Sequence, residues 1–160
     1  MGIEAEIGEY QEELVELRRW FHMHPEIGFK EYKTSKKIAE YLTELGLEVK
    51  TGVAETGVVA LLEGIHDGPT LMIRSDMDAL PIDEPDGLPY KSTHPGMMHA
   101  CGHDTHMAML LIAAKLLSKH RDQIYGRIKF VFQPNEEEAG AEDMVKAGVM
   151  ENPRVDAVTG

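Results

Sequence analysis

The amino-acid sequence predicts an α/β protein, with a layered mixed sheet and flanking helices. Three observations predict this class. Apolar residues recur at helical spacing over the first 46 residues, and short β-rich runs separated by Gly, Pro and Asp follow them. In the second half of the chain, strand patterns alternate with helix patterns, which is typical of a sheet covered by helices.

Two amphipathic helices are predicted at the start of the chain. From Ala5 to His22, apolar residues fall three or four positions apart, and Pro25 follows as a stop signal. Thr34 or Ser35 is then expected to cap a second helix, KKIAEYLTELG, which glycine ends.

Strands are predicted over LEVKTGV, TGVVALLEG and TLMIRSD, each bounded by turn residues. A Pro-rich loop from Asp83 to Gly96 separates them from a buried helix, expected from about Thr105 to Lys119. Beyond that helix, GRIKFVFQP and RVDAVTG are predicted strands, and AEDMVKAG is a predicted short helix.

Length and charge limit the classes of function. A chain of 160 residues accommodates one ordinary domain, and 42% hydrophobic with 28% charged residues is typical of a globular protein. The formal net charge is −12 and basic residues cluster only in pairs, so a phosphate backbone would be repelled and no nucleic-acid partner is expected. No run of about 20 apolar residues is present, so no membrane association is expected.

The N-terminal residues and the cysteine count predict a cytoplasmic location. The stretch MGIEAEIGEYQEEL is acidic, which is the wrong charge for a targeting signal. Cys101 is the only cysteine, so it cannot form a disulfide within the chain and is available as a thiolate.

The stretch MHACGHDTHMAML concentrates potential metal ligands. Cys101 and His103 are two positions apart, so both side chains can face one side while Gly102 lets the backbone bend. A thiolate and an imidazole are good ligands for zinc and its neighbours. A buried cysteine beside a hydrogen-bonded histidine is the alternative interpretation, and it is the more common one for Cys-x-His alone.

Three residues near Cys101 and His103 can each be interpreted in more than one way. Asp104 can cap the following helix or orient a ligand imidazole from behind. His99 and His106 flank the pair, and His106, in the first turn of the helix, is expected to be a surface residue rather than a ligand.

A second group of candidate residues lies in FQPNEEE. A predicted buried strand ends at Pro134, and Glu136, Glu137 and Glu138 follow immediately, where α/β sheets carry working loops. Near a metal, one carboxylate binds the ion while its neighbour holds water and takes its proton. The alternative is a solvated acidic loop, which is the usual meaning of a glutamate run.

A third group lies in RSDMDALP, where Arg74, Asp76 and Asp78 leave the end of a predicted central strand. Taken singly, each carboxylate is best interpreted as a salt-bridge partner of Arg74. Three such segments after successive β elements together favour a metal site in a crevice at the strand ends.

In order along the chain, these stretches resemble the N-terminal part of the M20 metallopeptidase family. The resemblance is to the branch of N-acyl-amino-acid hydrolases, hippurate hydrolases and thermostable carboxypeptidases. It rests on LRRWFHMHPEIGFKEYKTS, TGVVALLEG, RSDMDALPIDE, MHACGHDTHMAMLL, FQPNEEE and KAGVM. It implies a zinc-peptidase-like catalytic domain, of which residues 1–160 are the N-terminal part. By this resemblance, the lid or dimerisation domain and the C-terminal part of the catalytic domain are expected to lie outside these residues, and the full-length protein is expected to be a homo-oligomer.

The resemblance also implies roles for single residues. Cys101, His103 and Glu137 match metal ligands, and Glu136 matches the general base. Asp76 matches a strand-end aspartate that steadies a ligand, and it is counted among the catalytic residues. Asp78 and Asp104 are implied to orient the metal ligands without binding the metal themselves. His22 and His24 are implied to have a structural role. Two positions depart from the family pattern: Ser75 and Asn135 stand where alanine is usual.

The activity implied is metal-dependent hydrolysis of an amide bond in N-acyl amino acids or small peptides. Two divalent ions per full-length subunit, zinc or else manganese or cobalt, would activate water for attack. The isolated chain is expected to be inactive, and the alternative function is that of an α/β fragment with a partial metal site, serving as a binding or structural piece. A cysteine nucleophile at Cys101 paired with His103 is disfavoured, because residues two apart rarely reach the geometry for proton transfer.

Overall fold

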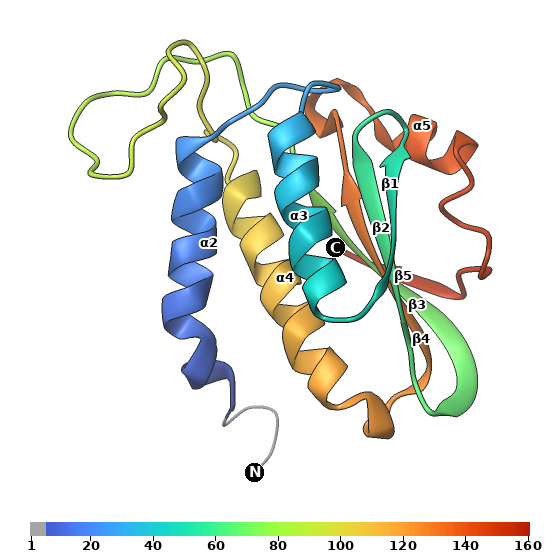
Figure 1. Cartoon of the computed structure of the whole chain (residues 1–160). Coiled ribbons are helices and arrows are strands. Elements are labelled where there is room, and N and C mark those ends of the chain that lie inside the picture. Colours follow the sequence, from blue (N-terminus) through green and yellow to red (C-terminus); the bar gives the residue numbers. More distant parts are fainter. Residues whose placement is uncertain (1–5) are drawn as a thin grey trace.

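The computed structural model describes residues 6–160, which build a five-stranded sheet in the order β1-β2-β4-β3-β5 (Figure 1). Antiparallel pairs join β1 to β2 and β2 to β4, whereas β3 runs parallel to both β4 and β5. The predicted layered mixed sheet is therefore confirmed. The strands are β1 (Glu48–Val53), β2 (Gly57–Glu63), β3 (His66–Asp76), β4 (Tyr125–Gln133) and β5 (Ala157–Thr159).

Helices cover both faces of the sheet. Three long helices lie side by side on one face, and the short α5 lies on the other (Figure 1). The α-helices are α2 (Gln11–Met23), α3 (Tyr32–Glu44), α4 (His103–Lys119) and α5 (Ala141–Lys146). Three 3₁₀ turns complete the set: η1 (Ile7–Tyr10), η2 (Arg121–Gln123) and η3 (Glu136–Glu138).

Strand β4 shows how the sequence builds both layers. Side chains alternate across a strand, so Ile128, Phe130 and Phe132 enter the core beneath the three long helices. Val131 faces the other way and packs with residues such as Met144 of α5. Every residue of this central strand from Ile128 to Gln133 is buried, and most of them are apolar, as expected of a strand covered on both sides.

Lys129, in the middle of β4, is a buried charged residue, only 2% exposed. Its ammonium group donates to the backbone carbonyls of Val149, Glu151 and Pro153 at 2.9, 2.9 and 2.8 Å. Burial lowers the pKa of Lys129. All three N–H donors have acceptors, so this side chain fixes the segment that leads into β5.

The helix boundaries differ from the sequence prediction at two starts. Helix α3 begins at Tyr32 with Glu31 as its N-cap residue, so the expected cap at Thr34 or Ser35 is wrong. Thr34 lies inside the first turn, and its hydroxyl donates to Glu26 at 2.9 Å. The first helix was predicted to begin at Ala5, which lies outside the described residues; α2 itself ends at Met23.

Helix α4 begins earlier than predicted, at His103. Gly102 is its N-cap and has a left-handed backbone with φ of 89°, so the chain can turn into the helix directly after Cys101. Strands β3 and β4 are parallel and Asp76 pairs with Gln133, so both strands end at the same edge of the sheet. The polar segments that follow them are thereby brought to the start of α4.

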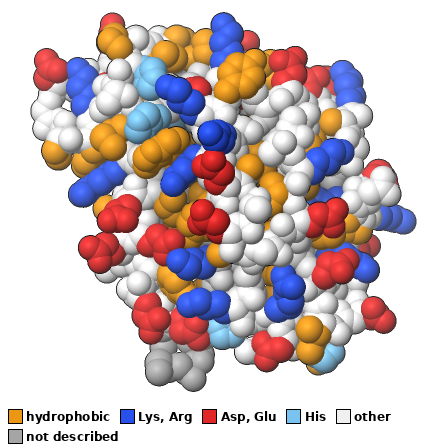
Figure 2. Space-filling model, in the orientation of Figure 1, with side chains coloured by type: hydrophobic (Ala, Val, Ile, Leu, Met, Phe, Trp, Pro, Cys, Tyr) orange, Lys and Arg blue, Asp and Glu red, His pale blue; other side chains and the backbone are white. Residues whose placement is uncertain are grey.

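The visible face of the molecule carries acidic and basic side chains interspersed with apolar ones (Figure 2). Among the described residues seen on this face, no continuous basic patch is present. Within residues 6–160, no helix combines the length and the apolar character needed to cross a membrane.

Candidate metal centre

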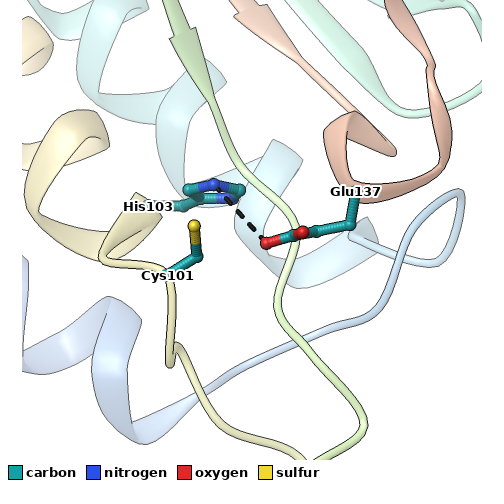
Figure 3. Close-up of side chains that lie close together, drawn as sticks. All are labelled: Cys101, His103 and Glu137. Carbon is teal, nitrogen blue, oxygen red and sulfur yellow. Dashed lines mark ion pairs between the residues drawn. The ribbon is translucent and has the colours of Figure 1, made fainter.

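Cys101, His103 and Glu137 converge although they belong to two distant segments. Cys101 precedes α4, His103 is the first residue of α4, and Glu137 lies in the turn after β4. One ligand atom of each lies within 4.8 Å of the other two. Figure 3 shows the thiol, the imidazole and the carboxylate pointing toward one another, with His103 Nε2 3.8 Å from Glu137 Oε1.

A second group of donors shares the same imidazole. Asp76, His103 and Glu136 also place one ligand atom each within 4.8 Å of one another. His103 Nε2 lies 3.7 Å from Asp76 Oδ2 and 3.7 Å from Glu136 Oε2. Three carboxylates therefore surround a single ring nitrogen.

The orientation of His103 is set by Asp78. His103 Nδ1 lies 2.9 Å from the backbone carbonyl of Asp78, and because a carbonyl only accepts, Nδ1 must donate. Nε2 is then free to bind a metal through its lone pair. Burial lowers the pKa of His103, but the contacts with Asp78 and the charge of Asp76 outweigh it, and the pKa is raised overall.

Asp78 also connects His103 to the glutamate turn. Its Oδ2 accepts the backbone N–H of Glu137 at 3.2 Å, and its Oδ1 lies 3.4 Å from His103 Nδ1. Burial acts to raise the pKa of Asp78, but hydrogen bonds from His103 and from the backbone of Glu137 and Glu136 prevail and lower it. An ionised Asp78 thus lies behind two of the candidate ligands.

Asp76 lies beside Nε2 of His103, the ring nitrogen that the other carboxylates also approach. The role of steadying a ligand stays a prediction for Asp76; in the structure it approaches Nε2, and Asp78 makes the contact with Nδ1. Arg74 Nη1 and His106 Nδ1 donate to Asp76 at 3.0 and 2.7 Å. His106 is about half exposed and belongs to neither donor group, so its role in this geometry is to hold Asp76.

Asp104 is not the N-cap residue of α4, which is Gly102, and its hydrogen-bond partners do not include His103. One oxygen of its buried carboxylate accepts the backbone N–H of Thr105 at 2.9 Å in the first turn, and the other turns toward α2. There it accepts from His22 Nδ1 at 2.7 Å and from Arg18 Nε at 2.9 Å. The other nitrogen of His22 lies 2.8 Å from Glu84, so the structural role implied for His22 is that of a bridge between two buried carboxylates.

His99 is buried beside this cluster without being part of it. The residue is 4% exposed, and neither ring nitrogen has a hydrogen-bond partner among the described residues. Burial lowers the pKa of His99 to about 4, so the ring is neutral at neutral pH. It is absent from both donor groups.

The donors fit a divalent cation. Burial raises the pKa of the Cys101 thiol, and the neighbouring carboxylates of Glu137, Glu136 and Asp76 raise it further. Gathered negative charge of this kind is costly unless a cation offsets it. A thiolate, an imidazole and a carboxylate are the ligands that zinc or cobalt prefers, whereas calcium and magnesium prefer oxygen ligands alone.

Two supporting residues escaped the sequence analysis. Glu84 lies in the Pro-rich loop, where no pattern distinguishes it from a solvated acid. Glu31 lies within a stretch that carries the family resemblance, yet local chemistry assigns it no role. Only the folded chain shows both carboxylates buried.

Comparison with known proteins assigns the family. The model of Peptidase family M20/M25/M40 matches residues 72–160, more than half of the chain. Thermostable carboxypeptidase 1 of Saccharolobus solfataricus is 47% identical over 152 residues, covering 92% of this chain and 39% of that protein. N-acyl-L-amino acid amidohydrolase of Geobacillus stearothermophilus is 46% identical over 156 residues, with 96% and 42% coverage. The chain belongs to peptidase family M20/M25/M40, which confirms the resemblance.

Solved structures agree with this assignment. The crystal structure of the Bacillus subtilis YxeP protein, described as a dinuclear metal-binding peptidase of the M20 family, superimposes with a TM-score of 0.88 at 42% identity. The match covers 94% of this chain and 42% of that one. The chain thus spans about two fifths of the length of the relatives it matches.

Proposed function

We propose that this chain carries part of the metal centre of an amidohydrolase or carboxypeptidase. The substrates would be N-acyl amino acids or small peptides, because one relative is named an N-acyl-L-amino acid amidohydrolase and another a carboxypeptidase. One observation carries the proposal: Cys101, His103 and Glu137, from two segments far apart in sequence, bring ligand atoms within 4.8 Å of one another. A structural salt-bridge network would have no need of the thiol.

We assign Cys101, His103 and Glu137 as protein ligands, with two divalent ions per subunit of the full-length enzyme. Zinc is the first choice for this ligand set, and manganese and cobalt are the alternatives. Bound ions of this kind supply Lewis acidity, which polarises an amide carbonyl and lowers the pKa of water. Asp78 engages Nδ1 of His103 and would thereby leave Nε2 available to hold an ion.

Glu136 is the general base in this proposal. Its carboxylate is 38% exposed and its Oε2 lies 3.7 Å from His103 Nε2, so it faces both the ligands and the solvent. From there it can take a proton from water and deliver it to the leaving amine. Glu137, one residue later, is left to bind metal.

Replacing the base tests this assignment. We expect Glu136→Gln to reduce hydrolysis of N-acyl and N-blocked amino acids by the full-length enzyme about 10²- to 10⁴-fold, because the amide cannot accept the proton. Zinc content, measured by elemental analysis, should stay at the parental level. Glu138→Gln, in the same turn, is the matched control and should retain activity. Parental turnover in Glu136→Gln would place the base elsewhere.

A second function, metal binding without turnover, is favoured for the 160-residue chain alone by one observation. Each donor group found among the described residues has three members, and both groups share His103. Three donors fit one ion with open positions, but a shared imidazole nitrogen cannot serve two ions. Stoichiometric zinc in this chain without hydrolysis of the same substrates would support this second function.

A further inference from the structure

Glu31 connects a segment outside the candidate metal centre to the turn that carries Glu136 and Glu137. It is fully buried, and although it is the N-cap residue of α3, its side chain does not cap that helix. One carboxylate oxygen accepts the backbone N–H of Asn135 at 3.0 Å. The other accepts the hydroxyl of Thr56 at 2.6 Å.

Asn135 organises the glutamate turn. Its backbone is left-handed, with φ of 54° and ψ of 40°, and it directly precedes η3. Its carbonyl accepts the N–H of Gly140 at 2.7 Å and that of Glu138 at 3.3 Å. A buried N–H without an acceptor destabilises a fold, so the Glu31 carboxylate completes the hydrogen bonding at this residue.

The contact between the two segments is tight. A Cβ atom added to Gly28 would overlap the side chain of Asn135, so the loop before α3 packs directly on the turn. Asp78 also holds the turn, because its carboxylate accepts the N–H of Glu137. Two buried carboxylates, on separate segments, therefore fix the backbone at residues 135 and 137.

Retaining an acid at position 31 has an energetic cost. Burial raises the pKa of Glu31, the charge of Asp78 adds to this, and the hydrogen bonds from Thr56 and Asn135 only partly oppose it. A side chain needed solely to begin α3 would not have to be buried against the turn that follows β4. The Glu26 carboxylate already serves that end of the helix, since it accepts from the Thr34 backbone and hydroxyl at 2.8 and 2.9 Å.

We propose that Glu31 is a positioning residue: its carboxylate fixes the turn at Asn135 and thereby holds the carboxylates of Glu136 and Glu137 beside His103. The inference rests on the proposed function for its link to metal binding. The hydrogen bond by which Glu31 fixes the turn at Asn135 is present in the metal-free chain, so its effect on the turn can be measured separately from metal binding.

Two variants of nearly equal size isolate the carboxylate oxygen. Glu31→Gln keeps an oxygen that can accept from Asn135, whereas Glu31→Met fills the same space without one. In metal-free protein, we expect Glu31→Met to speed hydrogen–deuterium exchange of the Asn135 amide at least about tenfold, with Glu31→Gln within about threefold of the parent. The dissociation constant for Co²⁺ should rise about 10- to 100-fold in Glu31→Met and less than about threefold in Glu31→Gln.

Glu26→Met is the matched control, because it weakens the same end of α3 without touching the turn. It should leave Asn135 exchange and Co²⁺ affinity at parental values. The inference is overturned if Asn135 exchange is unchanged in Glu31→Met, or if that variant binds Co²⁺ no more weakly than Glu26→Met. Should Glu31→Met fail to fold, Glu31→Leu, which also lacks an acceptor for the Asn135 N–H, takes its place, and parental Asn135 exchange in Glu31→Leu would equally overturn the inference.

Glu137→Ala separates this inference from the proposed function. If Glu137→Ala binds Co²⁺ as tightly as the parent, the ligand assignment is wrong, and the claim that Glu31 acts on metal binding is overturned with it. The exchange rate of Asn135 in Glu31→Met still decides whether Glu31 holds the turn.

Discussion

At the scale of single residues, the two ring nitrogens of His103 have different roles: one is held by the protein, and the other faces the candidate metal ligands. Its Nδ1 is engaged by the Asp78 carbonyl at 2.9 Å, and its Nε2 faces three carboxylates at 3.7 to 3.8 Å. Fixing one nitrogen removes the ring's freedom to present the wrong one. The position of the Asp78 carbonyl, two residues beyond β3, is therefore as important to the centre as any ligand.

The buried acid Glu31 gives a pH dependence of stability. Burial raises the pKa of Glu31 in the folded chain above its ordinary value of 4.5, which it keeps in the unfolded chain. At a pH between the unfolded and the folded pKa, the folded chain therefore binds more protons than the unfolded chain. The contribution of Glu31 to stability is therefore full below the unfolded pKa and is lost as the pH rises through the folded pKa. We expect Glu31→Gln, which cannot ionise, to gain stability relative to the parent as the pH rises from the unfolded pKa through the raised folded pKa of Glu31.

Urea unfolding of the parent and Glu31→Gln at several pH values measures this difference directly. The comparison cancels the titration of all other groups, provided that they behave alike in the two proteins. A difference in unfolding free energy that stays constant with pH, or that changes in the parent's favour, would contradict the raised pKa.

At the scale of elements, His22 joins α2 to the start of α4 and to the Pro-rich loop. Its two nitrogens contact Asp104 at 2.7 Å and Glu84 at 2.8 Å, and all three side chains are almost fully buried. Glu84 in turn accepts the backbone N–H of Ser92 at 2.6 Å. The helix that begins with His103 is thereby anchored one residue after the candidate ligand.

Replacing His22, which bridges Asp104 and Glu84, should strongly destabilise the fold. We expect His22→Phe to lower the unfolding free energy by about 3 to 5 kcal/mol, because two buried carboxylates lose their shared partner. His24→Phe is the control: His24 is partly exposed and stacks on Trp20, a contact that phenylalanine can keep, so a loss below about 1 kcal/mol is expected. Chemical denaturation compares them, and equal losses would show that His22 is not a bridge.

The sequence predicts the elements better than their boundaries. The long α2 and α3 were recognisable because apolar residues recur there at helical spacing, and α4 because it is a long run that is apolar over a broad face. The start of α3 was missed because Thr34 has the composition of a cap, yet Glu26 binds it from another segment. The start of α4 was placed too late because Asp104 also has the composition of a cap, whereas its carboxylate is engaged by His22 and Arg18.

At the scale of the whole molecule, the sheet order assembles the centre. Because β3 and β4 are parallel neighbours with Asp76 opposite Gln133, the chain leaves both strands at one edge, where α4 begins. Local patterns predict polar residues at strand ends, but pairing order and register depend on contacts between distant residues. The meeting of Cys101 with Glu137 was therefore expected from family resemblance, and buried supports such as Glu31 needed the folded chain.

The central claim is that the thiol of Cys101 is a metal ligand together with nitrogen and oxygen donors. X-ray absorption at the zinc edge of the zinc-loaded protein tests it most directly. We predict one sulfur neighbour at about 2.3 Å with nitrogen or oxygen neighbours at about 2.0 to 2.2 Å, and loss of the sulfur signal in Cys101→Ser. Because Cys101 is the only cysteine in the sequence, a zinc environment of nitrogen and oxygen alone in the parent would contradict the account.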